Sequence, residues 1–275
     1  MTFLSEFLNR IFDLLVAPFG TGAAWAMAFI ALVTGILMLL LFKWSTNQDR
    51  LAAVKSRLLG HLYELGLYQE NLRVMFRIQA DLARANLRYL ATTLPALLAI
   101  VVPLVLILAQ LDSRFAHRPF LPGETTLVTA TVDPASAALL SELELMSSAA
   151  VRVESLPVRD QARLTATWRV RVDGEGRHEL TLATPDGARW TKQLVAGSSG
   201  LPRLAQKREQ ASWRQFLFNP AETPLPGDSR ITSISLRLPA RQTRYLGIGL
   251  HWLAAFCIFS LAFGFALKDV FKVKI

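Results

Sequence analysis

Three long apolar stretches limit what this chain can fold into more than any other feature. They cover residues 23–42, 90–111 and 246–267. A helix of about 20 residues crosses a hydrocarbon core about 30 Å thick, so each stretch is long enough to span a membrane. The chain has 275 residues, of which 52% are hydrophobic, and this share is high for a soluble domain. We therefore predict an α-helical membrane protein with three transmembrane helices.

The cations between these stretches predict the topology. Residues 43–89 hold eight lysines and arginines against four acidic residues, and the tail 268–275 adds three lysines. Cytoplasmic loops of membrane proteins carry such an excess of cations, so we place both segments in the cytoplasm. The N-terminus and residues 112–243 then lie outside. This pattern predicts a multi-pass protein of the inner (plasma) membrane with its C-terminus in the cytoplasm.

Residues 1–20 have the pattern of an amphipathic helix. Apolar side chains such as Phe7 and Ile11 recur at helical spacing, whereas Asn9 and Asp13 lie on the opposite face. Pro18 and the glycine that follows it two residues later end the pattern. We expect this helix to lie flat on the outer membrane surface. Packing of the same helix on a partner subunit is the alternative.

The cytoplasmic segment 43–89 is predicted to form a helical hairpin, a short antiparallel coiled coil. Two leucine-rich stripes at helical spacing flank a turn near Gly66. The second arm has no proline or glycine before Pro95, so it can continue directly into the second span. Its cations are Arg73, Arg77, Arg84 and Arg88. Near the bilayer such cations attract anionic lipids, by about 1 kcal/mol each, although they also act simply as topology signals.

The outer segment 112–243 changes to the two-residue period of β-strands. The stretch "RLTATWRVRV", residues 163–172, alternates apolar and polar side chains and places Trp168 on the buried side. Asp-Gly pairs at 173–174 and 186–187 mark turns. Further strands are expected at 125–132, 177–184, 188–195 and 231–238, a helix at 135–146, and irregular chain at 197–229. Six or seven short strands predict a periplasmic β-sandwich inserted between the second and third spans.

Motifs for bond chemistry are absent from the sequence. It has no nucleotide-binding glycine loop, no zinc-protease motif and no nucleophile elbow. The four histidines are scattered, and the single cysteine, Cys257, excludes an intrachain disulfide. We therefore expect no enzymatic activity, no cofactor, no metal and no nucleic-acid partner.

The apolar stretches also carry small and weakly polar residues, which have two interpretations. Small faces allow helices to pack closely. Alternatively, they line a shallow hydrophilic groove between the three spans. The candidates for the groove are Thr34, Thr92, Gln110 and Ser260, with Thr93 beside the same face.

This order of elements resembles the YidC/Oxa/Alb insertase superfamily, above all its small members: the archaeal YidC-like proteins and the hairpin-bearing subunit of the endoplasmic-reticulum membrane protein complex. The resemblance covers residues 1–111 and 245–275, and it rests on order and topology. It implies a three-span core whose groove receives the hydrophilic flank of a nascent membrane protein while the hairpin captures it. In three respects the chain departs from this pattern: the groove has no intramembrane arginine, the hairpin holds only Met75 where many relatives are methionine-rich, and a β-domain separates the last two spans.

The resemblance implies client membrane proteins and anionic lipids as partners. Two other classes of function stay open. A scaffold or accessory subunit of a larger membrane complex would use the small faces for packing and the β-domain for docking other membrane subunits. A sensor would bind a ligand outside, but no output domain follows the hairpin.

Overall fold

The computed structural model describes residues 2–20, 22–45, 72–197, 200–212, 220–245 and 247–273, together with the single positions 53, 56, 59, 60, 63 and 215. The chain forms two compact units. The first, here called the β unit, comprises Met1–Ala26 and Leu106–Trp252. The second, here called the helical unit, comprises Met27–Val105 and Leu253–Ile275.

Helix α1, Thr2–Val16, opens the β unit and confirms the predicted N-terminal helix. Its two faces meet different surroundings. Asn9, Phe12 and Val16 are buried, whereas Phe7 is 52% and Leu14 75% exposed. A 3-10 turn, Ala17–Phe19, follows the helix. The helix therefore buries a partly polar face against the β unit and leaves an apolar face uncovered.

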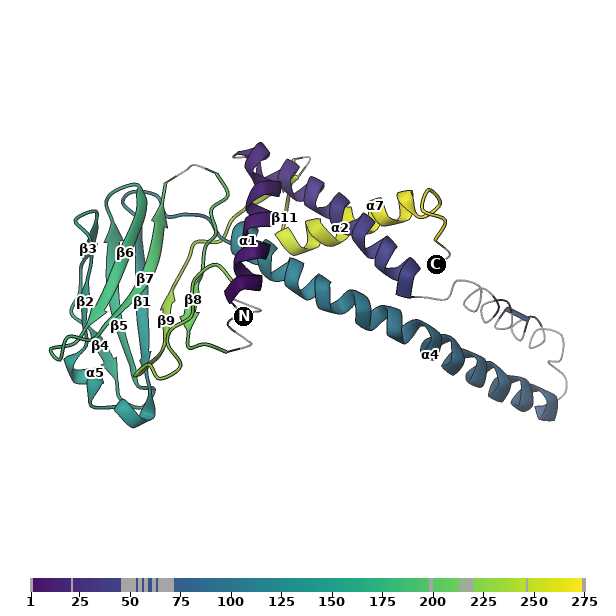
Figure 1. Cartoon of the computed structure of the whole chain (residues 1–275), viewed down its shortest axis with the longest axis horizontal. Coiled ribbons are helices and arrows are strands. Elements are labelled where there is room, and N and C mark those ends of the chain that lie inside the picture. Colours follow the sequence, from purple (N-terminus) through teal and green to yellow (C-terminus); the bar gives the residue numbers. More distant parts are fainter. Residues whose placement is uncertain are drawn as a thin grey trace. The chain divides into compact units, whose positions relative to one another are not determined.

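Two antiparallel sheets build the core of the β unit (Figure 1). The first has the strand order β3-β5-β1-β9-β8, and β4 also pairs with β5. The second has the order β2-β6-β7. The strands of the first are β1 Thr125–Val132, β3 Val151–Val153, β4 Val158–Asp160, β5 Thr165–Val172, β8 Lys207–Glu209 and β9 Ile231–Leu236, and those of the second are β2 Glu144–Met146, β6 Gly176–Ala183 and β7 Arg189–Ala196.

One hydrophobic core takes side chains from both sheets. Trp168 and Val170 of β5 belong to it, as do Leu180 of β6 and Leu194 of β7. Trp168 is only 2% exposed, which confirms its predicted position on the buried side of the strand. The hairpin between β6 and β7 turns at Gly187, whose φ of 86° favours glycine. Strict alternation along the strands therefore produces the core that it predicts.

The predicted helix at 135–146 is largely wrong. The chain instead forms a 3-10 turn at Pro134–Ser136 and one helical turn, α5, at Leu139–Glu142. Strand β2 follows, and its Leu145 pairs with Leu182 of β6. Pairing with a sheet edge satisfies the backbone of β2, and this tertiary contact overrides the helical pattern of the local sequence.

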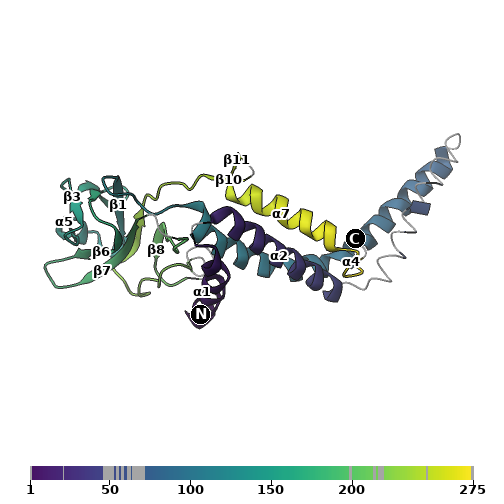
Figure 2. The same ribbon diagram turned by 90° about the horizontal axis from the view of Figure 1, so that it is seen from above.

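Three apolar helices lie largely in the helical unit. They are α2, Ala23–Ser45, from Met27 onward; α4, Leu72–Leu111, as far as Val105; and α7, Trp252–Leu267, from Leu253 onward. Figure 2 shows α2 and α7 side by side, where a Cβ on Gly35 would lie only 3.2 Å from the carbonyl oxygen of Ser260. Further along, Lys43 Nζ donates to the carbonyl oxygen of Phe271 at 2.9 Å. The later residue of α2, Lys43, contacts the later residue, Phe271, and the earlier Gly35 approaches the earlier Ser260, so α2 and α7 run parallel.

Within the described part of the chain, two helical stretches are long and apolar enough to cross a membrane, Ala23–Ser45 and Leu97–Ala116. The third predicted stretch, 246–267, is not one helix. Its first part forms β11, Ile248–Leu250, which pairs with β10, Thr243–Tyr245. Gly247 has a φ of 86° in the turn between the two strands. Helix α7 therefore starts only at Trp252 and has 16 residues.

The predicted hairpin is described only in part. Its first arm and its turn near Gly66 lie outside the described residues, apart from single positions. Its second arm belongs to α4, which runs from Leu72 to Leu111 without interruption although it contains Pro95 and Pro103. The expected continuity of the second arm with the second apolar stretch is therefore confirmed.

Candidate functional site

Helix α4 changes its surface along its length. Arg77, Arg84 and Arg88 are exposed on its first half, and Arg84 pairs with Asp81 at 2.9 Å. Arg73 lies in the first turn of the helix. The second half exposes large apolar side chains and no charged ones: Leu90, Leu94, Leu97, Leu98, Val101 and Val102 are 42–66% exposed. In the first half, Phe76 and Leu87 are each 66% exposed beside the arginines. One continuous helix thus joins a half that exposes arginines among apolar side chains to a half whose exposed surface is uncharged and suited to lipid.

The predicted groove residues of the helical unit bond to their own helices. Thr92 Oγ1 donates to the carbonyl oxygen of Arg88 at 2.8 Å, and Thr93 Oγ1 lies 3.1 Å from the carbonyl oxygen of Tyr89. Ser260 Oγ donates to the carbonyl oxygen of Cys257 at 3.2 Å. A hydroxyl that donates backwards in this way still has lone pairs to accept from a client or water. These groups therefore offer weak acceptors rather than strong polar anchors.

One of the groove candidates, Ser260, lies where α2 and α7 are in contact. Thr34 is 4% exposed, and its neighbour Gly35 approaches the backbone of Ser260 and of Gly264. Close approach of two helix backbones at small residues is the usual means of packing in a membrane. At this contact the small residues hold two helices together.

Gln110 lies in the β unit rather than in the helical unit, and it has a specific partner there. It is 2% exposed, and its Oε1 accepts from Arg114 Nη1 at 2.7 Å. Its carbonyl oxygen accepts from the same nitrogen at 3.1 Å. The side chain of Gln110 therefore orients a buried arginine.

Arg114 is fully buried in the π-helical turn Asp112–Ala116 that follows α4. Its Nη2 donates to Asp13 Oδ1 of α1 at 2.7 Å and to the carbonyl oxygen of Asn9 at 3.2 Å. The guanidinium also lies over the ring of Phe12, 5.7 Å from its centroid. The charge of Arg114 is thus met by a carboxylate, two carbonyl groups and an aromatic face.

The same cluster ties α1 to loops of the β unit. Asp13 Oδ2 lies 3.4 Å from Arg203 Nε, and Asn9 Nδ2 donates to the carbonyl oxygen of Pro220 at 2.9 Å. We call Asn9, Asp13, Gln110, Arg114 and Arg203 the Arg114 cluster. The sequence did not predict this cluster, because Asn9 and Asp13 lie on the polar face of an amphipathic helix and no pattern links that face to Arg114. The available signal was an isolated acid on an amphipathic helix together with an arginine directly after an apolar stretch.

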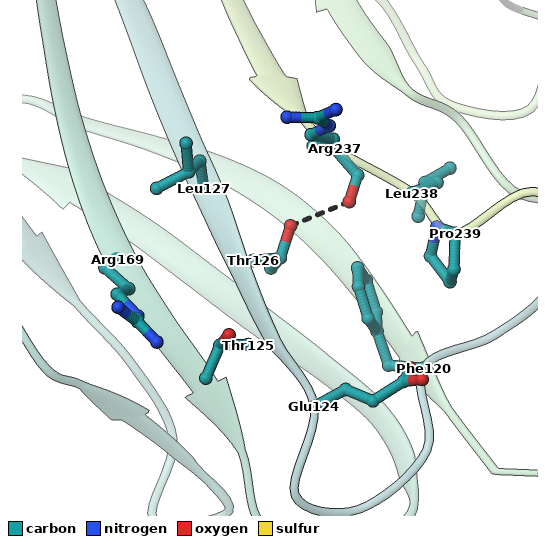
Figure 3. A pocket seen from close by; sticks show the side chains of 9 residues that line it. All are labelled: Phe120, Glu124, Thr125, Thr126, Leu127, Arg169, Arg237, Leu238 and Pro239. Atoms are coloured by element: carbon teal, nitrogen blue, oxygen red, sulfur yellow. Dashed lines mark hydrogen bonds between the residues drawn. The ribbon is translucent and has the colours of Figure 1, made fainter.

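A shallow hollow of about 520 Å³ lies at one end of the six-stranded sheet (Figure 3). Arg169 and Arg237 lie on either side of the exposed Leu127, and Thr126 donates to the carbonyl oxygen of Arg237 at 2.7 Å. Glu124 at its rim accepts from both terminal nitrogens of Arg118, at 2.7 and 3.0 Å. These bonds lower the pKa of Glu124, so its carboxylate stays ionised at neutral pH. The hollow has a mixed polar and apolar lining, and Glu124 is the one acidic residue among the residues that line it.

No family model, curated protein or solved structure matches the chain. Three features of the chain itself therefore bear on its function: helix α4, the contact of α2 with α7, and the Arg114 cluster.

Proposed function

We propose that the protein is a membrane-protein insertase of the YidC/Oxa type, which guides hydrophilic flanks of client proteins across one side of the bilayer. The observation that carries the proposal is helix α4. Its exposed arginines and its exposed apolar side chains follow one another on a single helix of 40 residues. A client segment that enters along such a helix meets cations at the level of the headgroups and then a lipid-like surface.

The proposed membrane arrangement has three spans, formed by α2, α4 and α7. Parallel α2 and α7 require the chain to return between them, and the apolar half of α4 supplies this return. Helix α7 has 16 residues, about 24 Å at 1.5 Å per residue, so the bilayer would be locally thin around it. Thinning lowers the barrier to moving a polar flank, which fits an insertase. We assign the protein to the inner membrane, with the N-terminus and a β-sandwich outside.

Helix α1 supports this arrangement. Its exposed Phe7, Ile11 and Leu14 form an uncovered apolar face, while Asn9 and Asp13 bond to the rest of the β unit. An apolar face directed away from the protein is stable when it lies in the acyl boundary of a bilayer. We therefore propose that α1 lies in the outer membrane surface with the Arg114 cluster behind it.

Crosslinking of nascent chains tests the proposal directly. A photoreactive amino acid is placed at Leu98, which is 60% exposed on α4, and, as a matched control, at Phe265, which is 56% exposed on α7. Stalled nascent membrane proteins of several kinds should crosslink at Leu98 and much less at Phe265. Crosslinks to lipid alone, or to the same single protein at both positions, would contradict insertase activity.

Removal of the α4 cations gives a second readout of the same proposal. Exchange of Arg77, Arg84 and Arg88 for glutamine should reduce the insertion of a reporter with a short translocated tail by about 10- to 150-fold, since each cation contributes about 0.5–1 kcal/mol near the headgroups. The protein itself should accumulate normally, because these side chains are exposed. Exchange of the exposed Arg163 in the β unit is the control and should leave insertion unchanged.

A scaffold or accessory subunit is the second candidate, and the contact between α2 and α7 favours it. The backbone of Ser260 lies close to Gly35 there, Thr34 is buried, and the hydroxyls of Thr92, Thr93 and Ser260 already donate to their own helices. Leucine at Thr92 and Thr93 separates the two functions. An insertase would accumulate normally and insert clients poorly, whereas a scaffold would lose its partner subunits. Gln110 is unsuited to this test because its replacement removes an acceptor from Arg114.

A further inference from the structure

The chain folds back on itself directly after α7. Phe271 N–H donates to the carbonyl oxygen of Leu267 at 3.1 Å, and Val273 N–H donates to that of Lys268 at 2.9 Å. Val273 is 5% exposed, so the end of this fold is anchored in the helical unit. We call residues 268–273 the C-terminal hook. It is an ordered element and not a loose tail.

The hook also binds the end of α2. Lys43, in the last turn of α2, donates from Nζ to the carbonyl oxygen of Phe271 at 2.9 Å. This bond brings the cation of Lys43 to the segment that carries Lys268 and Lys272. Asp269 is the one acidic residue between positions 268 and 273. The hook and the end of α2 therefore combine three ammonium groups with one carboxylate.

Lys272 adopts a backbone conformation that its side chain disfavours. Its φ is 53°, in the left-handed region where glycine is the usual residue. Glycine would form the same turn without that steric penalty. Strain of this kind is typical of positions where the side chain has a task. The ammonium group of Lys272 is the part of this residue that glycine would lack.

The surroundings of these lysines are those of a membrane surface. Lys43 lies in the last turn of α2, and Lys268 and Lys272 follow α7. The neighbouring side chains of Trp44 and Val270 are 78% and 71% exposed. Tryptophan at the end of an apolar helix is typical of the headgroup level. Within the described part of the chain, the ammonium group of Lys43 donates to the carbonyl oxygen of Phe271, and an ammonium group has three N–H donors.

We propose that Lys43, Lys268 and Lys272 form a binding site for the phosphate headgroup of an anionic phospholipid. The net positive charge of the site complements a phosphodiester, and Trp44 and Val270 would lie against the acyl chains of the same lipid. The lipid would hold the ends of α2 and α7 together in one leaflet. The site requires neither a client nor insertase activity, and it is independent of the proposed function.

Quenching of tryptophan fluorescence by brominated lipids tests the site in the full-length protein. The protein is reconstituted in phosphatidylcholine vesicles with a minor share of brominated phosphatidylglycerol, and in matched vesicles where the minor brominated lipid is phosphatidylcholine. The Trp44 signal is the difference between the wild-type protein and Trp44→Phe. Quenching should be several-fold stronger with phosphatidylglycerol. Equal quenching by the two lipids would overturn the proposal.

Two substitutions show whether the lysines cause the preference. Lys43→Gln and Lys272→Gly should each reduce the preference for phosphatidylglycerol about fivefold, the effect of one cation near a charged membrane surface. Lys272→Gly keeps the turn and relieves its strain, so a folding defect does not explain its loss of binding. Arg163→Gln, an exposed cation in the β unit, should leave the preference unchanged.

Soluble phosphate is the other source of the same chemistry. Millimolar inorganic phosphate or glycerol phosphate should leave the quenching by brominated phosphatidylglycerol unchanged, because neither supplies an acyl chain for Trp44 and Val270. If either compound removes the preference completely, the site binds free phosphate and the lipid assignment is wrong. An unchanged preference in both lysine variants would equally contradict it.

Discussion

The two units of this protein differ in the exposure of their large apolar side chains. In the β unit large apolar residues are inside: Trp168 is 2% and Leu194 0% exposed. In the helical unit Leu98 is 60% and Leu261 61% exposed. The hydrophobic effect accounts for the first arrangement, because apolar surface avoids water in a core, and the membrane location proposed above accounts for the second. The comparison teaches that the same type of side chain is buried in one unit and exposed in the other, so apolar composition alone does not decide which face of an element is buried.

Helix α1 shows that this difference does not follow the boundary between the units. Its contacts belong to the β unit, but its exposed surface includes the apolar Phe7, Ile11 and Leu14, while the polar Asn9 is buried and Asp13 is partly exposed. Asn9 bonds from Nδ2 to the carbonyl oxygen of Pro220, and its own carbonyl oxygen accepts from Arg114. The surface of the β unit therefore includes one region with the pattern of a membrane protein.

The largest expected change in the free energy of unfolding comes from shortening a large apolar side chain, and it should differ between the two units. Trp168→Ala should destabilise the β unit by about 3–5 kcal/mol, since it removes a large side chain from a closed core. Leu98→Ala should change stability by less than about 1 kcal/mol, because a leucine that is 60% exposed leaves no closed cavity when it is shortened. Unfolding of the full-length protein in detergent, followed by limited proteolysis, measures both. A loss of about 2–5 kcal/mol at Leu98 would mean that protein, and not lipid, covers that face.

The second prediction concerns charge. Asp13→Asn should destabilise the protein by about 2 kcal/mol, less than the 3–5 typical for breaking a buried pair because Asp13 is 45% exposed while Arg114 is fully buried. Replacing both residues, as Asp13→Asn with Arg114→Met, should restore part of the loss. A double-mutant cycle in chemical denaturation measures this coupling.

The exposed pair of Arg84 with Asp81 in the helical unit is the matched control, and Arg84→Gln should change stability by about 0–1 kcal/mol. Equal effects at Asp13 and at Arg84 would show that the Arg114 cluster is no more buried in solution than a surface ion pair.

The smallest expected effect tests the close packing of α2 against α7 in the helical unit. Gly35→Val should destabilise it by about 1–2 kcal/mol, because the added side chain would meet the Ser260 carbonyl oxygen, 3.2 Å from an ideal Cβ. Gly264→Ala is the control, since its Cβ would meet nothing within 4 Å. Thermal unfolding in detergent compares the two. Full tolerance of valine at position 35 would exclude a close contact of α2 with α7.

Sequence by itself determined the features that depend on local periodicity. Strand β1 occupies the predicted range, and the alternation around Trp168 correctly identifies its buried side, because successive side chains of a strand point to opposite faces. The continuity of the basic and apolar halves of α4 was equally readable, since no residue between them breaks a helix strongly enough. These features need no knowledge of a distant partner.

Tertiary structure alone decided the features that depend on partners far apart in the sequence. The helical pattern at 135–146 gave way to β2 because an edge of β6 was available for pairing. The start of the third apolar stretch became β11 because β10 precedes it across a glycine turn. Asp13 and Arg114 are separated by 101 positions, and no periodicity links them. The fold brings them together, and the burial of Arg114 then makes a carboxylate at that place necessary, because an unpaired charge in a closed interior is far less stable than one in water.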